Sequence, residues 1–152
     1  MVTAEFRFYG ETIMAYTVKK VEVWAGDILN RPGTLARVLE SLSNAGAQLE
    51  FMIARRVNPD TSRVFLAPLK GTKQQRAAAD VGVVRAAGLH ALRIDGPDRP
   101  GLGAHITRAL ADKGINIRGA SAASLGKKLV VYLAFETPEA VTQAASVLRK
   151  AL

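Results

Sequence analysis

One short motif occurs twice in this chain, and that duplication constrains the fold more than any other feature. Residues 30–33 read Asn-Arg-Pro-Gly and residues 98–101 read Asp-Arg-Pro-Gly, an offset of 99 − 31 = 68 positions. At the same offset Gly46 matches Gly114, and Gln48 matches Asn116. A unit of this length that occurs only twice indicates two copies of one small domain rather than a stacked solenoid.

The composition indicates a folded protein without disulfides or membrane spans. Hydrophobic residues make up 49% of the 152 residues, and cysteine is absent, which excludes disulfides and thiolate metal sites. No apolar run approaches the ~20 residues of a membrane span. The first twenty residues mix Glu5, Arg7 and Glu11 into apolar stretches, so no secretory leader is predicted. We therefore expect a cytoplasmic protein that does not associate with membranes.

The formal charge of +8 raises the question of nucleic-acid binding, but its distribution argues against it. Lysine and arginine occur singly or in pairs, with no run of five like charges. The few aromatic residues are not interleaved with basic ones, as stacking platforms for bases require. His90 and His105 lack other ligands at metal-binding spacing. We expect a solvated basic surface, no nucleic acid, no metal and no cofactor.

The first copy has the pattern of a βαββαβ unit. Residues 21–25 alternate as a strand does, and Pro32 suits an early helical position with Asn30 ahead as a possible cap. The helix carries an apolar stripe and ends at Gly46, where a left-handed residue is cheap. Strands are predicted from residue 49 and over residues 63–67, then a helix over residues 72–80 and a short strand at residues 83–84.

The second copy repeats this order. The patterns predict a strand over residues 89–95, a helix over 100–113 that ends at Gly114, and paired strands over 115–123 and 127–136. Thr137 and Pro138 open the last helix, as cap and first-turn proline. No fourth strand follows. Residues 1–18 either fill that edge of the sheet or form a loose extension.

Taken together, the two motifs and their strand–helix context resemble the ACT domain, a family of small modules that bind amino acids. Each Arg-Pro-Gly follows a strand and opens an amphipathic helix, which a Gly-x-Gln/Asn start of the next strand follows. The resemblance implies an α+β fold of two tandem ferredoxin-like βαββαβ domains, with antiparallel sheets and helices on one face. We expect an N-terminal extension over residues 1–18, a first domain over 19–87 and a second over 88–152.

The resemblance places ligands at the strand–helix loops of paired domains. Glycine lets the backbone approach a ligand, and a helix N-terminus favours an anion such as a carboxylate. Arginines add charge-assisted hydrogen bonds, and the α-amino group needs polar acceptors. The candidate ligand-binding residues are Asn30, Arg31, Pro32, Gly33, Thr34, Gln48, Asp98, Arg99, Pro100, Gly101, Leu102 and Asn116.

Each of these residue types also has a structural interpretation. Gly33 and Gly101 suit tight turns, the arginines suit solvated surface positions, and Asn30 and Asp98 suit helix caps. Asn116, flanked by isoleucines, most requires a polar partner. Gln48 departs from the asparagine that is usual in the family. Because Leu35 matches Gly103, the two loops need not bind equally.

The sequence favours a regulatory protein over an enzyme. We find no Gly-x-Ser-x-Gly, phosphate-binding loop or dinucleotide fingerprint, and no convincing pair of carboxylates. An RNA-binding role would need an aromatic third-strand motif, which is missing. We expect a non-catalytic, allosteric binder of an amino acid or similar metabolite, or alternatively a dissociable regulatory subunit of an amino-acid biosynthetic enzyme. Exposed sheet edges favour a homodimer, and the resemblance adds a metabolic enzyme or a transcription factor as partner.

Overall fold

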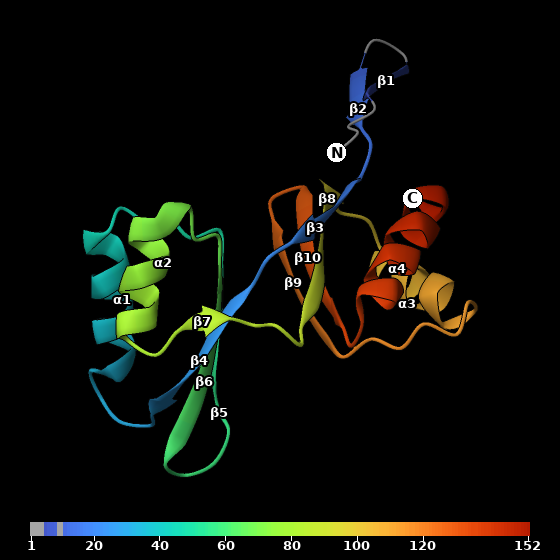
Figure 1. The fold of residues 1–152 in the computed structure, drawn as a ribbon. Helices are drawn as coiled ribbons and strands as arrows, with labels where there is room; N and C mark the ends of the chain where they lie inside the picture. Colours follow the sequence, from blue (N-terminus) through green and yellow to red (C-terminus); the bar gives the residue numbers. More distant parts are fainter. Residues whose placement is uncertain (1–4, 9–10) are drawn as a thin grey trace. The chain divides into compact units, whose positions relative to one another are not determined.

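A computed structural model describes residues 5–8 and 11–152, in which the chain folds into two compact units. One unit joins the described residues up to Val21 to residues 88–152, and the other consists of residues 22–87 (Figure 1). We call them the discontinuous unit and the continuous unit. We expected the first domain to begin at residue 19, whereas in the structure residues 19–21 belong to the discontinuous unit.

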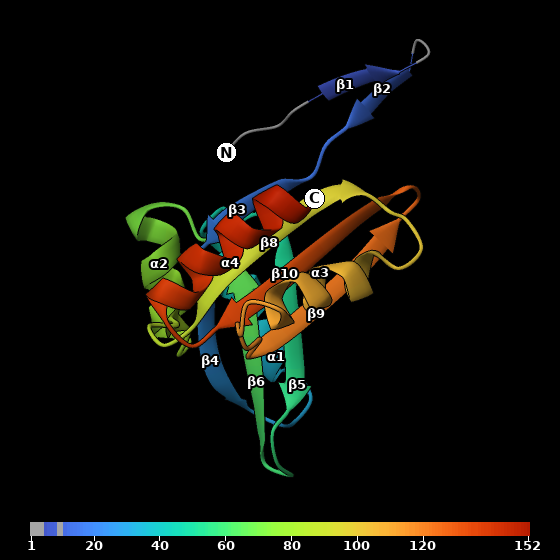
Figure 2. The ribbon, with the colours of Figure 1, turned by 90° about the vertical axis from the view of Figure 1, so that its right-hand side faces the viewer.

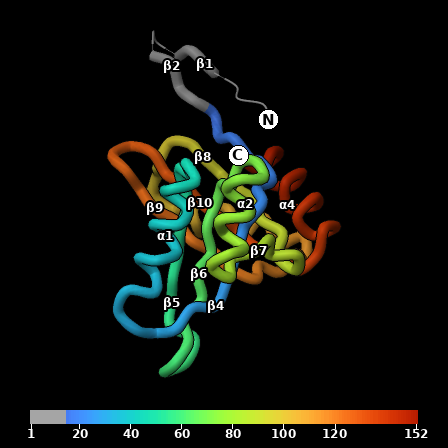
Figure 3. Tube along the Cα trace, turned by 60° about the vertical axis from the view of Figure 1, so that its left-hand side comes forward, coloured from blue at the N-terminus to red at the C-terminus, as the bar shows by residue number. Residues whose placement is uncertain are grey.

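The continuous unit is a complete βαββαβ fold. Its strands are β4 (Trp24–Leu29), β5 (Phe51–Arg56), β6 (Thr61–Ala67) and β7 (Val84–Arg85), in the sheet order β5-β6-β4-β7. Helices α1 (Thr34–Asn44) and α2 (Gly71–Asp80) lie side by side on one face (Figure 3). Trp24, Val38, Leu42 and Leu66 are buried between them and the sheet, as the apolar stripe of the first helix predicted.

The discontinuous unit has the same sheet order, but one strand comes from before the continuous unit. Its strands are β3 (Thr17–Val21), β8 (His90–Pro97), β9 (Gly119–Leu125) and β10 (Lys128–Phe135), in the order β3-β8-β10-β9. Helices α3 (Leu102–Ala111) and α4 (Pro138–Ala151) cover one face of it (Figure 2). The expected fold class, two ferredoxin-like units with helices on one face, is confirmed.

Strand β3 fills the edge that the second copy leaves open. Thr17 pairs with Asp95 and Val21 with Ala91, antiparallel, as β7 pairs with β4 in the other unit. Val18 is 4% exposed within the core of the discontinuous unit. Of the two alternatives for the N-terminal segment, edge filling therefore holds for residues 17–21. Upstream, β1 (Glu5–Phe8) and β2 (Glu11–Met14) pair with each other, and residues 1–4 and 9–10 of the expected extension lie outside the described residues.

Helix ends follow the predicted chemistry at three places. Gly46 and Gly114 have φ of +81° and +70°, and the amides that follow them bond back to Leu42 and Leu110 at 3.0 Å. This left-handed ending satisfies the last carbonyls of a helix. Thr137 caps α4 by accepting a 3.0 Å hydrogen bond from the Ala140 amide. Some strand positions were wrong: β4 and β9 begin three and four residues later than expected, because Val21 still pairs with Ala91 as the end of β3 and the pairing of β9 with β10 starts at Gly119.

No helix among residues 5–8 and 11–152 has both the length and the apolar character that crossing a bilayer demands.

Shortening Val18 tests whether β3 is part of the discontinuous unit. We expect Val18→Ala to lower the free energy of unfolding of that unit by about 1–2 kcal/mol, because two buried methyl groups are lost. Hydrogen exchange should quicken in β8 and α4 and stay unchanged in α1 and β6. Val84→Ala is the matched control, since Val84 is 57% exposed. Faster exchange in α1 and β6 alone would contradict this assignment.

Candidate functional site

Each unit turns from the strand before its Arg-Pro-Gly motif into a helix through a glycine in the left-handed region. We call residues 30–34 the first corner and residues 98–102 the second corner. Gly33 has φ of +92° and Gly101 of +80°, and each is the residue at which its helix begins. A Cβ at either position would meet nothing within 4 Å, so the requirement for glycine is one of backbone conformation rather than of space.

The glycine corners leave the helix N-termini without side-chain caps. The amides of Leu35 and Ala36 at the first corner, and of Gly103 and Ala104 at the second, have no hydrogen-bond partner among the described residues. Free amides and the positive end of the helix dipole attract anions. Each corner therefore offers a place where a carboxylate would be stabilised.

Asn30 and Asp98 tie the corners to neighbouring hairpin turns and do not cap helices. The Asn30 amide donates to the Asp60 carbonyl at 2.8 Å, and the Asp98 amide to the Lys127 carbonyl at 2.8 Å. The Asn30 side chain donates to the Pro59 carbonyl at 3.0 Å, while Asp98 accepts from Ser124 Oγ at 2.9 Å. The cap interpretation was wrong because the left-handed glycine starts the helix three residues later.

The remaining corner residues fall into an exposed and an inward-facing group. Arg31, Pro32, Arg99 and Pro100 are exposed, and both prolines precede the helix instead of lying in its first turn. Thr34 is half-buried, and its hydroxyl donates to the Leu29 carbonyl at 2.6 Å. The corresponding Leu102 is 2% exposed in the core. The two corners thus share a backbone plan and differ in their side chains.

Gln48 and Asn116 do not reach the corner of their own unit. Both are exposed and precede their strands, because β5 begins at Phe51 and β9 at Gly119. In the continuous unit Leu29, next to the first corner, pairs with Thr61, whereas Phe51 pairs with Ala67 at the other end of β6. Six residues of strand separate those pairs by about 20 Å. Within one unit, therefore, the corner and the start of the second strand are separate places.

Tyr16 touches the second corner, and no sequence pattern singled it out. Its hydroxyl donates to the Pro97 carbonyl at 2.6 Å, and the Arg99 guanidinium lies 5.7 Å from its ring centre. Residue 16 stands outside both copies of the repeat, so the match between the copies could not reveal it. An aromatic residue directly before an edge strand was the available signal.

Asp27 of β4 has a lowered pKa because the Arg63 guanidinium hydrogen-bonds its carboxylate. Arg63 Nε and Nη2 donate to the two carboxylate oxygens at 2.6 and 3.0 Å. Both side chains are about half exposed, on the sheet face opposite the helices. The pair thus sits apart from the helix N-terminus of the first corner and suits a structural role.

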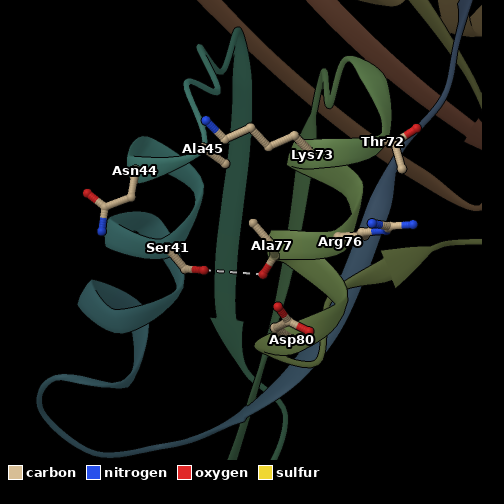
Figure 4. Close-up of a pocket in the computed structure, with 8 residues that line it drawn as sticks. All are labelled: Ser41, Asn44, Ala45, Thr72, Lys73, Arg76, Ala77 and Asp80. Carbon is tan, nitrogen blue, oxygen red and sulfur yellow. Dashed lines mark hydrogen bonds between the residues drawn. The ribbon is translucent and has the colours of Figure 1, made fainter.

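A shallow groove of about 560 Å³ lies between α1 and α2, and none of the candidate residues lines it. Ser41 Oγ donates to the Ala77 carbonyl at 3.2 Å across its floor, and the Lys73 side chain extends from α2 toward α1 (Figure 4). Among the described residues, no three His, Asp or Glu side chains gather as metal ligands would.

One family model matches the part of the discontinuous unit that contains the second corner. Residues 90–152 match the family model of the ACT domain. The match begins at His90, the first residue of β8, and includes the second corner, α3, β9, β10 and α4. It leaves out β3 and the whole continuous unit. No curated protein matches the chain in sequence.

Solved structures with this two-unit fold include regulatory proteins. The chain resembles protein BT0572 from Bacteroides thetaiotaomicron, with a TM-score of 0.74 and 18% identity over 88% of this chain and 89% of that one. It also resembles the regulatory subunit of aspartate kinase from Thermus thermophilus, with a TM-score of 0.66 and 16% identity over 92% and 98%. The comparison with aspartate kinase from Clostridium acetobutylicum gives a TM-score of 0.62 and 20% identity, over 91% of this chain and 34% of that chain. At these identities the likeness concerns the fold.

The ion pair of Asp27 predicts a pH effect with a definite sign. A lowered pKa in the folded state contributes stability above the unfolded pKa, and this contribution is lost as pH falls through the folded value. We expect Arg63→Gln to raise the carboxyl midpoint of Asp27 toward its ordinary 3.8, measured by carboxyl NMR. Arg55→Gln is the control, since Arg55 pairs with Arg63 in register. An unchanged midpoint in Arg63→Gln would contradict the assigned cause.

Proposed function

We propose that this protein is a non-catalytic regulatory module that binds a small ligand, foremost an amino acid, at its two strand–helix corners. The observation that carries the proposal is the pair of left-handed glycines, each of which opens a helix whose first free amides have no partner among the described residues. A ligand carboxylate would accept from those amides, and Arg31 or Arg99 would add charge-assisted bonds. The match of residues 90–152 to the ACT domain supports this assignment.

We further propose that a second copy of the chain completes the second corner. The edge strand β9 carries no charged residue or proline, whereas β3 has Lys19 and Lys20 and β5 has Arg55 and Arg56. Edge strands without such protection pair readily with another strand. Antiparallel pairing of two β9 strands would form a continuous sheet across a two-fold homodimer.

Such a homodimer would bring Asn116 to the corner of the other subunit. The end of β9 lies beside the second corner, since Lys128 pairs with both Leu125 and Pro97. An antiparallel β9 from the second copy begins at that end, and Asn116 of the partner subunit lies three residues before it. Its amide oxygen would accept a hydrogen bond from the ligand's α-amino group. This pairing leaves β5 without a partner strand from the second copy, so it gives Gln48 no such role at the first corner.

Regulation would follow from a population shift. A ligand that binds one arrangement of the subunits more tightly favours it only by the difference of its affinities. The downstream partner would be a metabolic enzyme or a transcription factor. The second candidate function is a dissociable regulatory subunit of an amino-acid biosynthetic enzyme, because the chain covers 98% of the Thermus thermophilus aspartate kinase regulatory subunit. The test is sedimentation of this chain with and without the aspartate kinase catalytic chain of the same organism. A larger species that forms only in the mixture would favour the regulatory-subunit function.

A thermal-shift screen of the twenty standard amino acids tests ligand binding. At a hundredfold excess over Kd, binding adds about 2.7 kcal/mol to stability. For a chain of this size, that should raise Tm by about 5–10 °C. If no amino acid shifts the transition at millimolar concentration, the binding proposal fails.

Gly101→Val should abolish the part of the ligand-induced rise in Tm that comes from binding at the second corner. A β-branched residue at this position strains the left-handed backbone and covers the free amides. Gly114→Val is the matched control, since Gly114 also has a positive φ and open space, at the opposite end of α3. Both variants should lose about 1–2 kcal/mol of stability. An undiminished shift in Gly101→Val would move the site away from the second corner.

The oligomeric state tests the β9 edge. We expect Ala122→Lys, in the middle of β9, to convert a homodimer into a monomer in analytical ultracentrifugation, because a buried lysine blocks strand pairing. Ala54→Lys in the edge strand β5 is the matched control and should stay dimeric. A monomeric wild-type chain would refute the dimer.

A further inference from the structure

The Tyr16 ring lies directly against bare backbone at the second corner. It stands one residue before β3 and continues its alignment with β8, so it faces Gly96. A Cβ built on Gly96 would lie only 2.2 Å from the ring atom Cδ1. The hydroxyl donates to the Pro97 carbonyl at 2.6 Å. Glycine at position 96 is therefore required for space, because any side chain there would displace the ring.

The same ring holds the Arg99 side chain without using its hydrogen-bond donors. The guanidinium carbon lies 5.7 Å from the ring centre, within the range of a cation–π interaction. Arg99 has no hydrogen bond or ion pair from its side chain to any residue whose side chain the structure describes. Its five N–H donors thus remain available while the group itself is supported.

The first corner lacks this support. At the repeat offset of 68 positions, Ile28 stands where Gly96 does and Arg31 where Arg99 does. Ile28 carries a β-branched side chain, which packs against the core of its own unit, where Gly96 leaves bare backbone for a ring. Arg31 has no ring contact, ion pair or side-chain hydrogen bond among the described side chains.

We propose that Tyr16 is a positioning residue that holds Arg99 at the second corner, so that this corner presents a preset cation to the ligand's carboxylate. The inference rests on the proposed function and deepens it. A free arginine loses rotamer entropy when a ligand fixes it, and a supported one loses less. The second corner therefore binds the carboxylate more tightly than the first, and residues upstream of β3 belong to its site.

Variants at Tyr16 and Gly96 test this by ligand affinity. Each of the twenty standard amino acids is the probe, and the one with the largest thermal shift is titrated by calorimetry. Tyr16→Leu and Gly96→Ala should each weaken binding roughly threefold to tenfold. Tyr16→Phe keeps the ring and should stay within about twofold of wild type. Arg99→Gln should weaken binding more than Arg31→Gln, and adding Tyr16→Leu to Arg99→Gln should cost nothing further.

A second readout reports on Arg99 directly. In ¹⁵N NMR the Arg99 Nε–Hε signal should carry a ring-current shift in wild type and in Tyr16→Phe and lose it in Tyr16→Leu. Tyr132→Leu is the matched control, because Tyr132 also lies 5.7 Å from a guanidinium, that of Arg93, in the same unit. It should leave the Arg99 signal in place.

The failures are distinguishable. If Tyr16→Leu and Gly96→Ala bind the amino acid as tightly as wild type, or if the Arg99 NMR signal does not move in Tyr16→Leu, the role of Tyr16 alone is overturned. If no amino acid raises the Tm of the wild-type protein, the proposed function is overturned, and the role of Tyr16 with it.

Discussion

Both units depend on a glycine with positive φ between a strand and a helix. At φ of +92° and +80° the chain reverses sharply enough for α1 and α3 to pack back across the sheets that their strands belong to. An L-residue with a side chain pays about 1–2 kcal/mol for that conformation. Because glycine cannot cap with a side chain, the turn that directs the helix onto the core also leaves two amides of the first helical turn without a partner among the described residues. Packing and the proposed chemistry thus share one cause.

The second constraint is the passage of β3 into the sheet of the discontinuous unit. The edge beside β8 needs a strand, and the five residues 17–21 supply it with Val18 buried in the core. This pairing brings Tyr16 to the second corner. The match to the ACT domain starts at His90, so the matched residues include the second corner but not β3 or Tyr16.

The two corners illustrate how duplication allows divergence. Their amides, glycines and hairpin ties are nearly the same, with Asn30 and Asp98 each held 2.8 Å from a turn carbonyl. Their side chains differ: Thr34 stands where Leu102 does, and among the described side chains Arg99 has a tyrosine ring beside it whereas Arg31 has none. Similar backbones with different side chains would let the two proposed sites bind one ligand with two affinities, or two different ligands.

The sequence by itself determined what depends on a few neighbouring residues. The apolar stripe with Val38 and Leu42, the left-handed endings at Gly46 and Gly114 and the Thr137 cap were all predictable, because helix periodicity and capping are local. Only the tertiary structure decided which strand fills the edge beside β8, that Asn30 and Asp98 bond to hairpin turns, and that the strand after Gln48 starts at the end of β6 away from the first corner. Those outcomes depend on pairing between residues far apart in the chain. The total free energy of the fold selects each partner, and no local sequence pattern indicates which one is selected.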